Sequence, residues 1–256
     1  MRYKIVLSYD GSGFCGWQMQ SEAKTVQECL QAALSTLLKE EIAVTGAGRT
    51  DSKVNAINYA AHFDSSAPDL DAAGFGYKIN AILPHGIKVH GISKAEPGFH
   101  ARFDARQREY KYFIHRKKDP FMGEYSYLYT FPLDVQAMNE AAGYLLGKHD
   151  FSCFEKVGSD NKTSICTVTK AVWEPYTPDH AAIMGYPHEE GDYLVFTISA
   201  DRFLRNMVRA VVGSLLDVGR GRRDKSWLAS LVNGGSRSMA GESVPGNALF
   251  LTRVEY

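Results

Sequence analysis

A glycine-rich turn at residues 45–55, TGAGRTDSKVN, most constrains how this chain can fold. Apolar residues on either side predict a strand at 41–44 and another at 54–63, so the turn must join two buried strands. Glycine lets a backbone approach a ligand closely, and loops held by strands often carry reactive groups. The charged pair Arg49 and Asp51 is therefore a candidate site. The alternative is a turn aspartate that bonds only its own backbone.

The rest of the chain predicts two similar halves of mixed helix and strand. Alternating apolar residues indicate half-buried strands, and a capping box at Thr25 indicates the first helix. We expect strands at 2–10, 41–44, 54–63, 87–92, 110–115, 165–173, 193–199 and 248–254, and helices at 25–39, 71–82, 134–147 and 203–218. This order predicts an α+β fold in which two α/β halves, with antiparallel and mixed sheets, are joined around a central cleft. We place the boundary so that residues 1–104 carry the aspartate turn and residues 105–256 form the second half.

Residues 11–16 match the pattern G-x-G-x-x-G directly after the first predicted strand. In a dinucleotide-binding fold these glycines open a helix, and an acidic residue follows about 20 positions later, after a second strand. Here the next helix begins only near Thr25, and the expected acidic position falls inside it. We therefore reject a dinucleotide-binding fold.

Charge is balanced over the whole chain but not along it. The sequence has 29 basic and 29 acidic residues, so its net charge indicates no class of partner. Residues 100–118 and residues 202–225 each contain seven Lys or Arg and two acidic side chains, a local net charge of +5. Two basic segments on a neutral chain predict a local surface for an anionic partner.

The second basic segment places arginines at the start of a predicted helix. Arg202, Arg205 and Arg209 are spaced i, i+3, i+7, so a helix at 203–218 would align them along one flank. Arginines in the first turns face the positive end of the helix dipole, which is mildly unfavourable. We therefore expect phosphates, a carboxylate or both opposite them. The alternative is a solvated charged flank.

The four cysteines show neither a C-x-x-C pattern nor a metal-type spacing. Reduced, buried thiols in a cytoplasmic protein are consistent with this usage. The N-terminus enters a strand pattern directly, without a signal peptide, and no apolar run approaches membrane-spanning length. We expect a soluble cytoplasmic protein with no membrane partner.

Short motifs along nearly the whole chain match one family in their order. They are Tyr9-Asp-Gly11, Phe14-Cys-Gly16-Trp-Gln18-Met-Gln20, Thr25-Val-Gln-Glu28, Gly48-Arg-Thr-Asp51, Asn80-Ala-Ile-Leu-Pro84, Phe99-His-Ala-Arg102-Phe, Tyr110-Lys-Tyr112, His149-Asp-Phe151, Phe203-Leu-Arg-Asn-Met-Val-Arg209, Val244-Pro245 and Leu249-Phe-Leu251. Each motif is weak alone, but their order is specific. With these motifs the chain resembles the tRNA pseudouridine synthase A family, which isomerises uridines at positions 38–40 of the tRNA anticodon stem-loop. The resemblance implies the pseudouridine synthase fold, tRNA as partner, a homodimer, and no cofactor or metal.

The resemblance also implies roles for the matching residues. Asp51 would be the catalytic aspartate, and Arg49 would help to displace the target base. Tyr110 would stack on the uracil, Arg209 would pair with the aspartate, and Leu249 would line the pocket wall. The residues expected to follow the tRNA backbone lie in the basic segment at 202–225 and are Arg202, Arg205, Arg220, Arg222 and Arg223.

The chain departs from the family pattern directly after the aspartate. The family usually has a small residue followed by Gly, Val, His and Ala, whereas this chain has Ser-Lys-Val-Asn-Ala at 52–56. Lys53 stands where a residue able to take positive φ is usual, and Asn55 stands where a histidine is usual. Asparagine tolerates unusual backbone geometry and still donates a hydrogen bond.

The expected reaction sets requirements that these side chains can meet. The bond between C1′ and N1 of uridine must break, the base must rotate, and C1′ must join C5. An ionised Asp51 could attack C1′ or take the C2′ proton, and the sequence leaves both open. A guanidinium such as Arg209 favours the charged carboxylate. An aromatic ring such as Tyr110 offsets part of the unstacking of the base.

Two other functions are compatible with parts of the sequence. A catalytically silent tRNA-binding or tRNA-folding protein of the same fold would keep the motifs, and turnover on tRNA separates it from the enzyme. A glycoside-type hydrolase would need a second carboxylate across the sugar, and none stands out in the sequence.

Overall fold

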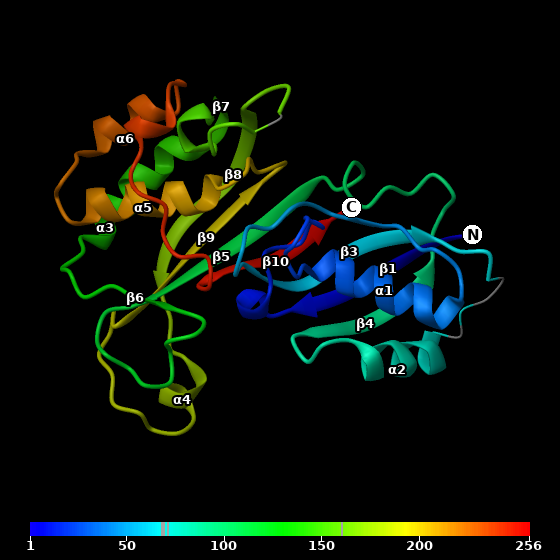
Figure 1. The fold of residues 1–256 in the computed structure, drawn as a ribbon. Helices are drawn as coiled ribbons and strands as arrows, with labels where there is room; N and C mark the ends of the chain where they lie inside the picture. The colour runs from blue at the N-terminus through cyan, green and yellow to red at the C-terminus, as the bar shows by residue number, and fades with distance from the viewer. Residues whose placement is uncertain (68–69, 71, 160) are drawn as a thin grey trace. The chain divides into compact units, whose positions relative to one another are not determined.

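The computed structural model describes residues 1–67, 70, 72–159 and 161–256 and divides the chain into two units (Figure 1). The first unit contains residues 1–108 and 250–256, and the second contains residues 109–249. The chain leaves the first unit within β5 (Gln107–His115) and returns to it within β10 (Leu249–Glu255). The boundary that we predicted at 104/105 assigned the last strand to the second half, whereas residues 250–256 belong to the first unit.

The first unit contains a mixed sheet built around β1 (Arg2–Tyr9). β1 pairs antiparallel with β3 (Asn55–Asp64) on one side and with β4 (Ile87–Lys94) on the other. The short β2 (Val44–Gly46) also pairs antiparallel with β3, whereas β10 runs parallel to β3. The aspartate turn therefore connects two strands, β2 and β3, that are hydrogen-bonded to each other.

The alternation in β1 explains how this sheet is anchored. Tyr3, Ile5, Leu7 and Tyr9 are buried, and the residues between them are half-buried. The ring of Tyr3 stacks on Phe63 of β3, with ring centroids 5.5 Å apart. Burial of each such apolar side chain stabilises the fold by about 1.5–3 kcal/mol. The half-buried strand predicted at 2–10 is confirmed.

The helices α1 and α2 belong to the first unit. α1 (Val26–Leu38) begins at the predicted capping box, where Thr25 Oγ1 accepts a hydrogen bond from Glu28 N at 3.4 Å. It ends at Leu38, and the next residue, Lys39, takes a left-handed φ of 55°. α2 (Ala72–Ile82) packs against β4 and α1, and α1 also contacts β2.

The second unit has a sheet in the order β5–β9–β8–β7. β8 (Ile165–Pro175) pairs antiparallel with β9 (Tyr193–Ala200) and with β7 (Gly147–Asp150). The short β6 (Tyr127–Leu128) runs parallel to β5. The predicted hairpin of β8 and β9 is confirmed, and every residue of β9 is buried.

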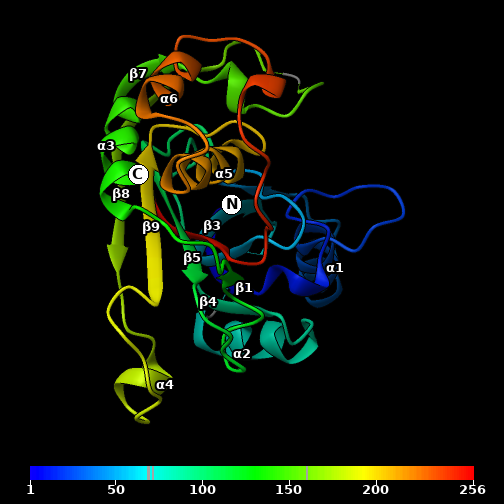
Figure 2. The same cartoon turned by 90° about the vertical axis from the view of Figure 1, so that its left-hand side faces the viewer.

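Helices α3, α5 and α6 of the second unit lie together, and α4 lies apart from them. α3 (Val135–Ala142) packs against α5 (Met207–Gly219), α6 (Lys225–Leu231) and β8. Figures 1 and 2 show that α4 (Asp179–Ala182) lies at the far end of the long connection between β8 and β9. Short 3-10 helices lie at Gly11–Gly13, Gly143–Leu145, Ser152–Phe154 and Arg237–Met239.

The structure corrects the predicted start of α5. The helix was expected at 203–218, but it begins at Met207. The reason is Asn206, whose left-handed φ of 68° interrupts the helical backbone before the first turn. The apolar pattern continues through Leu204, which is buried without being helical. Hydrophobic spacing alone therefore placed the start too early.

Other element bounds also differ from the prediction. The helix expected at 134–147 ends as an α-helix at Ala142, because a 3-10 turn follows and Gly147, with a φ of 101°, opens β7. The strand expected at 41–44 begins only at Val44. α6 was not predicted, although Asp224 caps it by accepting a hydrogen bond from Trp227 N at 2.8 Å.

The predicted fold class is confirmed, because helices cover sheets with both parallel and antiparallel pairs. Among the described residues, no helix is long and apolar enough to cross a membrane. The cysteines are unpaired: Cys153 and Cys166 are buried as expected, whereas Cys15 is exposed and Cys29 is half-buried.

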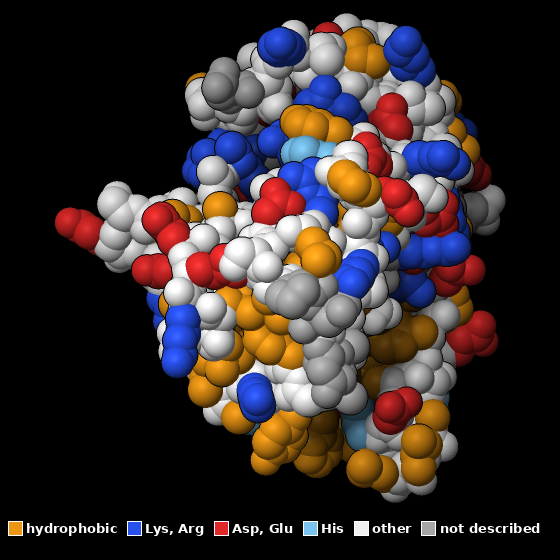
Figure 3. Space-filling view, turned by 90° about the vertical axis from the view of Figure 1, so that its right-hand side faces the viewer, with side chains coloured by type: hydrophobic (Ala, Val, Ile, Leu, Met, Phe, Trp, Pro, Cys, Tyr) orange, Lys and Arg blue, Asp and Glu red, His pale blue; other side chains and the backbone are white. Residues whose placement is uncertain are grey.

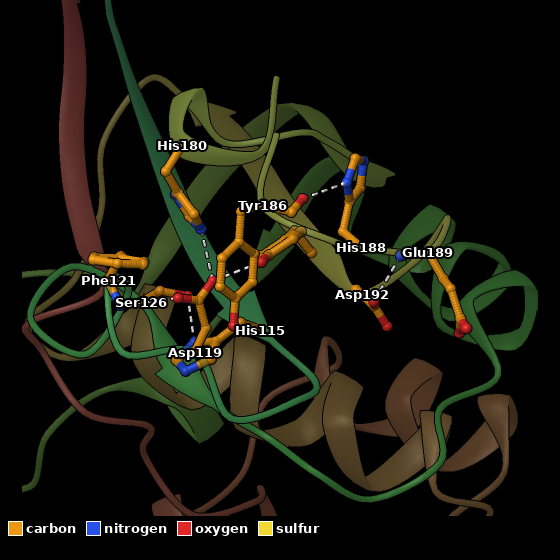
Figure 4. A network of polar contacts seen from close by, with 10 residues as sticks. His115, Asp119, Phe121, Ser126, His180, Tyr186, His188, Glu189 and Asp192 are labelled. Carbon is orange, nitrogen blue, oxygen red and sulfur yellow. Dashed lines mark hydrogen bonds and ion pairs between the residues drawn. The ribbon is translucent and has the colours of Figure 1, made fainter. Parts of the chain in front are cut away.

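A buried polar network fixes the connection at 176–192, which we call the 176–192 arm (Figure 4). Asp119 Oδ2, from the segment after β5, accepts hydrogen bonds from His180 Nε2 at 2.7 Å and from the Tyr193 hydroxyl at 2.6 Å. Asp119 Oδ1 accepts a third from Phe121 N at 2.9 Å. Burial alone would raise the pKa of Asp119, but these hydrogen bonds outweigh it and hold the pKa below its usual range.

Because its pKa is lowered by folding, Asp119 stabilises the protein above the ordinary carboxyl pKa, and this stabilisation is lost as the pH falls through the lowered value. We expect Asp119→Asn to lower the free energy of unfolding at pH 7 by about 1.5–3 kcal/mol, the contribution of a hydrogen-bonded charge. Urea titrations of both proteins at pH 7 and near pH 3.5 measure this. The difference should shrink at the lower pH.

The control for this prediction is Asp179→Asn, at an exposed carboxylate on the same arm. It should change the free energy of unfolding by no more than about 0.5 kcal/mol. Equal effects of the two substitutions would show that the Asp119 network does not hold the arm.

Candidate active site

The aspartate turn spans residues 47–54, between β2 and β3. Asp51 is half-buried in it, and Arg49 is exposed two residues earlier. The turn closes through a hydrogen bond from Val54 N to Asp51 O at 3.2 Å. Lys53 takes a left-handed φ of 65°, which is strained for a residue other than glycine. The backbone geometry therefore reverses the chain directly after the aspartate.

The glycines at 11 and 16 let residues 10–17 pack directly on this turn. A Cβ atom on Gly11 would lie 2.3 Å from Val54 O, and one on Gly16 would lie 2.4 Å from Thr50 O. Gly16 also has a left-handed φ of 88°. Two of the three glycines in the G-x-G-x-x-G pattern thus serve a close contact between two backbones, which explains Gly11 and Gly16 without a bound nucleotide.

Backbone hydrogen bonds accompany this close approach. Trp17 N donates to Thr50 O at 3.3 Å, one residue before the aspartate. Lys53 N donates to Phe14 O at 3.3 Å, two residues after it. Asp51 is therefore flanked on both sides by main chain that is bonded to residues 10–17.

Buried side chains complete the support of the turn. The Tyr9 hydroxyl and Thr50 Oγ1 lie 2.8 Å apart in a buried hydrogen bond. Asn55 is only 2% exposed, and its Oδ1 accepts from Gly11 N at 2.8 Å. The Tyr59 hydroxyl bonds both the carbonyl and the amide of Gly48. Such supports hold a reactive side chain in one geometry.

The second unit holds three further residues that the sequence assigns to the site. Tyr110 lies in β5 with its ring edge-on to Phe203, at 5.1 Å between centroids. Leu249 is the buried first residue of β10. Arg209 lies in the first turn of α5. Asp51 and Arg49 belong to the first unit, so the structure places the expected site residues in two groups.

The segment at 241–245 packs against α5 and holds the side chain of Arg209. Arg209 Nε donates to Val244 O at 2.7 Å, and Val244 N donates back to Arg209 O at 3.2 Å. A Cβ atom on Gly213 would lie 1.8 Å from Glu242 O, so only glycine allows the segment to lie this close to the helix. One edge of the guanidinium is therefore fixed by a main-chain carbonyl.

Comparison with known proteins decides the family. A family model described as tRNA pseudouridine synthase matches residues 141–256. A Bacteroides fragilis protein named tRNA pseudouridine synthase A is 46% identical over 256 residues, with 100% of this chain and 96% of that protein covered. A protein of the same name from Bacteroides thetaiotaomicron is 45% identical, with coverages of 100% and 90%. This chain belongs to the tRNA pseudouridine synthase A family.

A more distant similarity exists among solved structures. It covers 97% of this chain and 57% of a chain in a structure titled "Crystal Structure of a Cbf5-Nop10-Gar1 Complex", at 13% identity and a TM-score of 0.33. A score this low carries no argument, so the family assignment rests on the sequence relatives.

The two departures from the family pattern have structural consequences in the turn. Lys53 takes the positive φ for which glycine is better suited. Asn55 lies in the extended backbone of β3, so its tolerance of unusual geometry is not used. In the bond to Gly11 the carboxamide oxygen of Asn55 is the acceptor, and a donor role for its NH2 group stays a prediction.

The predicted stripe of Arg202, Arg205 and Arg209 along one helix is wrong. The first two residues precede α5, and the left-handed Asn206 separates them from it. Arg202 Nη2 instead lies 3.4 Å from Asn161 Oδ1. The helix-dipole argument applies only to Arg209, because the other two arginines are not in the first turn.

The arginines that follow α5 have partners within the second unit. The Arg220 guanidinium lies 3.6 Å from the centroid of the Phe131 ring, Arg222 pairs with Asp217 at 3.4 Å, and Arg223 lies 5.2 Å from Trp227. Arg222 and Arg223 are exposed, and Arg220 is half-buried. Their role in RNA binding stays a prediction.

The contacts of the turn predict a large cost for a side chain at Gly16. Gly16→Ala would force a left-handed residue and a clash with Thr50 O. We expect the free energy of unfolding to fall by about 1–3 kcal/mol, the usual cost of such strain. Urea unfolding followed by circular dichroism measures it.

Gly13→Ala is the matched control, because no heavy atom lies within 4 Å of its Cβ position. This substitution should stay within about 0.5 kcal/mol of the wild type. If both variants unfold like the wild type, the close contact is not needed for folding.

Proposed function

We propose that this protein isomerises uridine to pseudouridine at positions 38–40 in the anticodon stem-loop of tRNA. The observation that carries this proposal is Asp51, a carboxylate on a turn that main-chain contacts hold on both sides. Family membership supports the reaction, since the relatives are named tRNA pseudouridine synthase A.

The reaction needs one carboxylate and no redox partner. Asp51 either attacks C1′ or takes the C2′ proton, and the C1′–N1 bond breaks with its electrons going to N1. The freed uracil rotates, and C5 forms the new bond to C1′. In the first route the bond between Asp51 and C1′ breaks as C5 attacks, and in the second route Asp51 returns the proton to C2′. The proton on C5 is then lost and N1 gains one, so product and substrate have the same atoms. No cofactor or metal is required.

The other site residues bind and orient the nucleotide in this proposal. Arg49 helps to displace the uridine from its stack, and Tyr110 stacks on the flipped uracil. Leu249 lines the pocket wall. Arg209 pairs with Asp51 and keeps it ionised, and its fixed Nε supports such a role because the guanidinium is held in one orientation.

The protein binds tRNA through its basic residues and works as a cytoplasmic homodimer in this proposal. The residues proposed to contact the tRNA backbone are Arg202, Arg205, Arg220, Arg222 and Arg223. The absence of an overall positive charge suits recognition of a folded RNA shape rather than of any polyanion.

Asp51→Asn tests the proposed catalyst, because it keeps the shape of the side chain and removes its charge. Formation of pseudouridine in transcribed tRNA should fall to below about one-thousandth of the wild-type rate. Binding of tRNA should change less than about threefold, because the main-chain contacts of the turn are kept. Turnover by the Asp51→Asn variant would contradict the proposal. Absence of turnover in the wild type would contradict it too, and would favour a catalytically silent tRNA-binding protein.

Arg209→Met tests the proposed pair with Asp51. Without the guanidinium, ionisation of the carboxylate should require a higher pH, so single-turnover activity should fall near pH 7 and partly recover on raising the pH. Arg209→Lys should shift the profile less, because it keeps the charge but loses the planar fork.

The competing role for Arg209 is contact with a phosphate. That role predicts weaker tRNA binding and an unshifted pH profile at saturating tRNA. An unshifted profile with normal chemistry in Arg209→Met would remove the residue from the active site.

A further inference from the structure

The segment at 99–105, which we call the 99–105 loop, is rigidly held within the first unit. Ala101 N donates to His62 Nδ1 at 3.1 Å, and Ala101 O accepts from the Tyr256 hydroxyl at 2.8 Å. Burial lowers the pKa of His62, which favours the neutral ring needed as an acceptor. Within the loop, His100 N donates to Asp104 Oδ2 at 2.7 Å and His100 O accepts from Asp104 N at 3.0 Å.

One guanidinium ties this loop to the aspartate turn. Arg108 donates to Arg102 O at 2.6 Å and to Ala105 O at 2.7 Å, both in the 99–105 loop. The same side chain donates to Ala47 O at 3.0 Å, at the first residue of the aspartate turn. The loop is therefore anchored four residues before Asp51, within the same unit.

This rigid loop presents an exposed aromatic ring. Phe103 is 75% exposed, although burying a phenylalanine normally stabilises a fold. Its ring stacks on the His100 ring with centroids 4.2 Å apart and planes at 29°, so its orientation is defined. The Arg102 guanidinium lies 5.7 Å from the ring centroid, and both Arg102 and Arg106 are exposed.

Exposure alone does not identify a site. Tyr77 on α2 is 80% exposed, and Figure 3 shows other hydrophobic side chains gathered in the lower part of the face that it draws. Phe103 differs because it has a stacking partner, flanking arginines and an anchor to the aspartate turn. A ring with neighbouring positive charge suits a nucleobase and its phosphate, since every base can stack and the phosphates are anionic.

We propose that Phe103, backed by His100, is a stacking platform for an unpaired nucleobase of the RNA substrate, with Arg102 at the adjoining phosphate. This proposal rests on the proposed function, because it takes the RNA that Asp51 modifies as the partner. The base is not the target uridine, which Tyr110 receives in the proposed function. The platform adds binding energy and does not take part in the chemistry.

Phe103→Ala should weaken binding of a tRNA anticodon stem-loop by roughly 5- to 100-fold, the usual effect of losing one stacked base. The rate at saturating RNA and the unfolding midpoint should stay at wild-type values. Phe103→Trp should bind at least as well as the wild type, because it keeps an aromatic face. Tyr77→Ala is the control for an equally exposed aromatic side chain and should leave binding unchanged.

A stem-loop with 2-aminopurine in its loop gives a direct signal of stacking. Its fluorescence should be quenched by the wild type and by Phe103→Trp, but not by Phe103→Ala at saturating protein. Arg102→Gln should instead lower the slope of log Kd against log salt concentration by about one phosphate contact. It should keep the quenching of the 2-aminopurine fluorescence.

Unchanged affinity and quenching in Phe103→Ala would overturn the platform, and so would an equal loss in Tyr77→Ala. If Phe103→Ala changed the mass of the protein in solution without changing RNA affinity, the ring would contact a second copy of the chain and the proposal would be wrong. If the wild-type protein still forms pseudouridine, any of these results overturns the platform but leaves the proposed function unaffected. Loss of turnover in the wild type, with stacking intact, would refute the proposed function alone.

Discussion

Main-chain contact between residues 10–17 and the aspartate turn is the constraint on which the candidate site depends. A Cβ atom at either Gly11 or Gly16 would overlap a carbonyl of the turn, so both residues must be glycine for the contact to form. Hydrogen bonds from the same segment reach the residues on both sides of Asp51. The position of Asp51 is thus determined by the backbone on both sides of it.

The sequence predicted the long periodic elements well and their ends less well. α1 was placed correctly because its capping box is a local signal, and β1 because its apolar residues alternate along the strand with Val6 as the exception. The start of α5 was placed too early because Asn206 ends the regular backbone where the apolar pattern continues. The missed α6 has a capping aspartate at Asp224, but its helix is only seven residues long, which is short for a periodic signal.

For the site, the motifs identified the reactive residues but not the residues that support them. Tyr9 and Thr50 are 41 positions apart, and Gly11 and Asn55 are 44 apart, so their hydrogen bonds follow only from strand pairing. The count of charged residues likewise could not show which arginines are exposed. The arginines after α5 counted equally in the sequence, yet Arg220 is half-buried over an aromatic ring.

The departures after Asp51 show which features the turn requires. Lys53 accepts a left-handed φ that costs about 1–2 kcal/mol relative to glycine, and the turn still forms because Lys53 N is bonded to Phe14 O. At Asn55 the requirement is an acceptor for Gly11 N, and a carboxamide oxygen meets it from a fully buried position. The turn is therefore held by the path of the backbone and by one buried acceptor, whereas the Lys53 side chain is exposed and gives the turn none of these contacts.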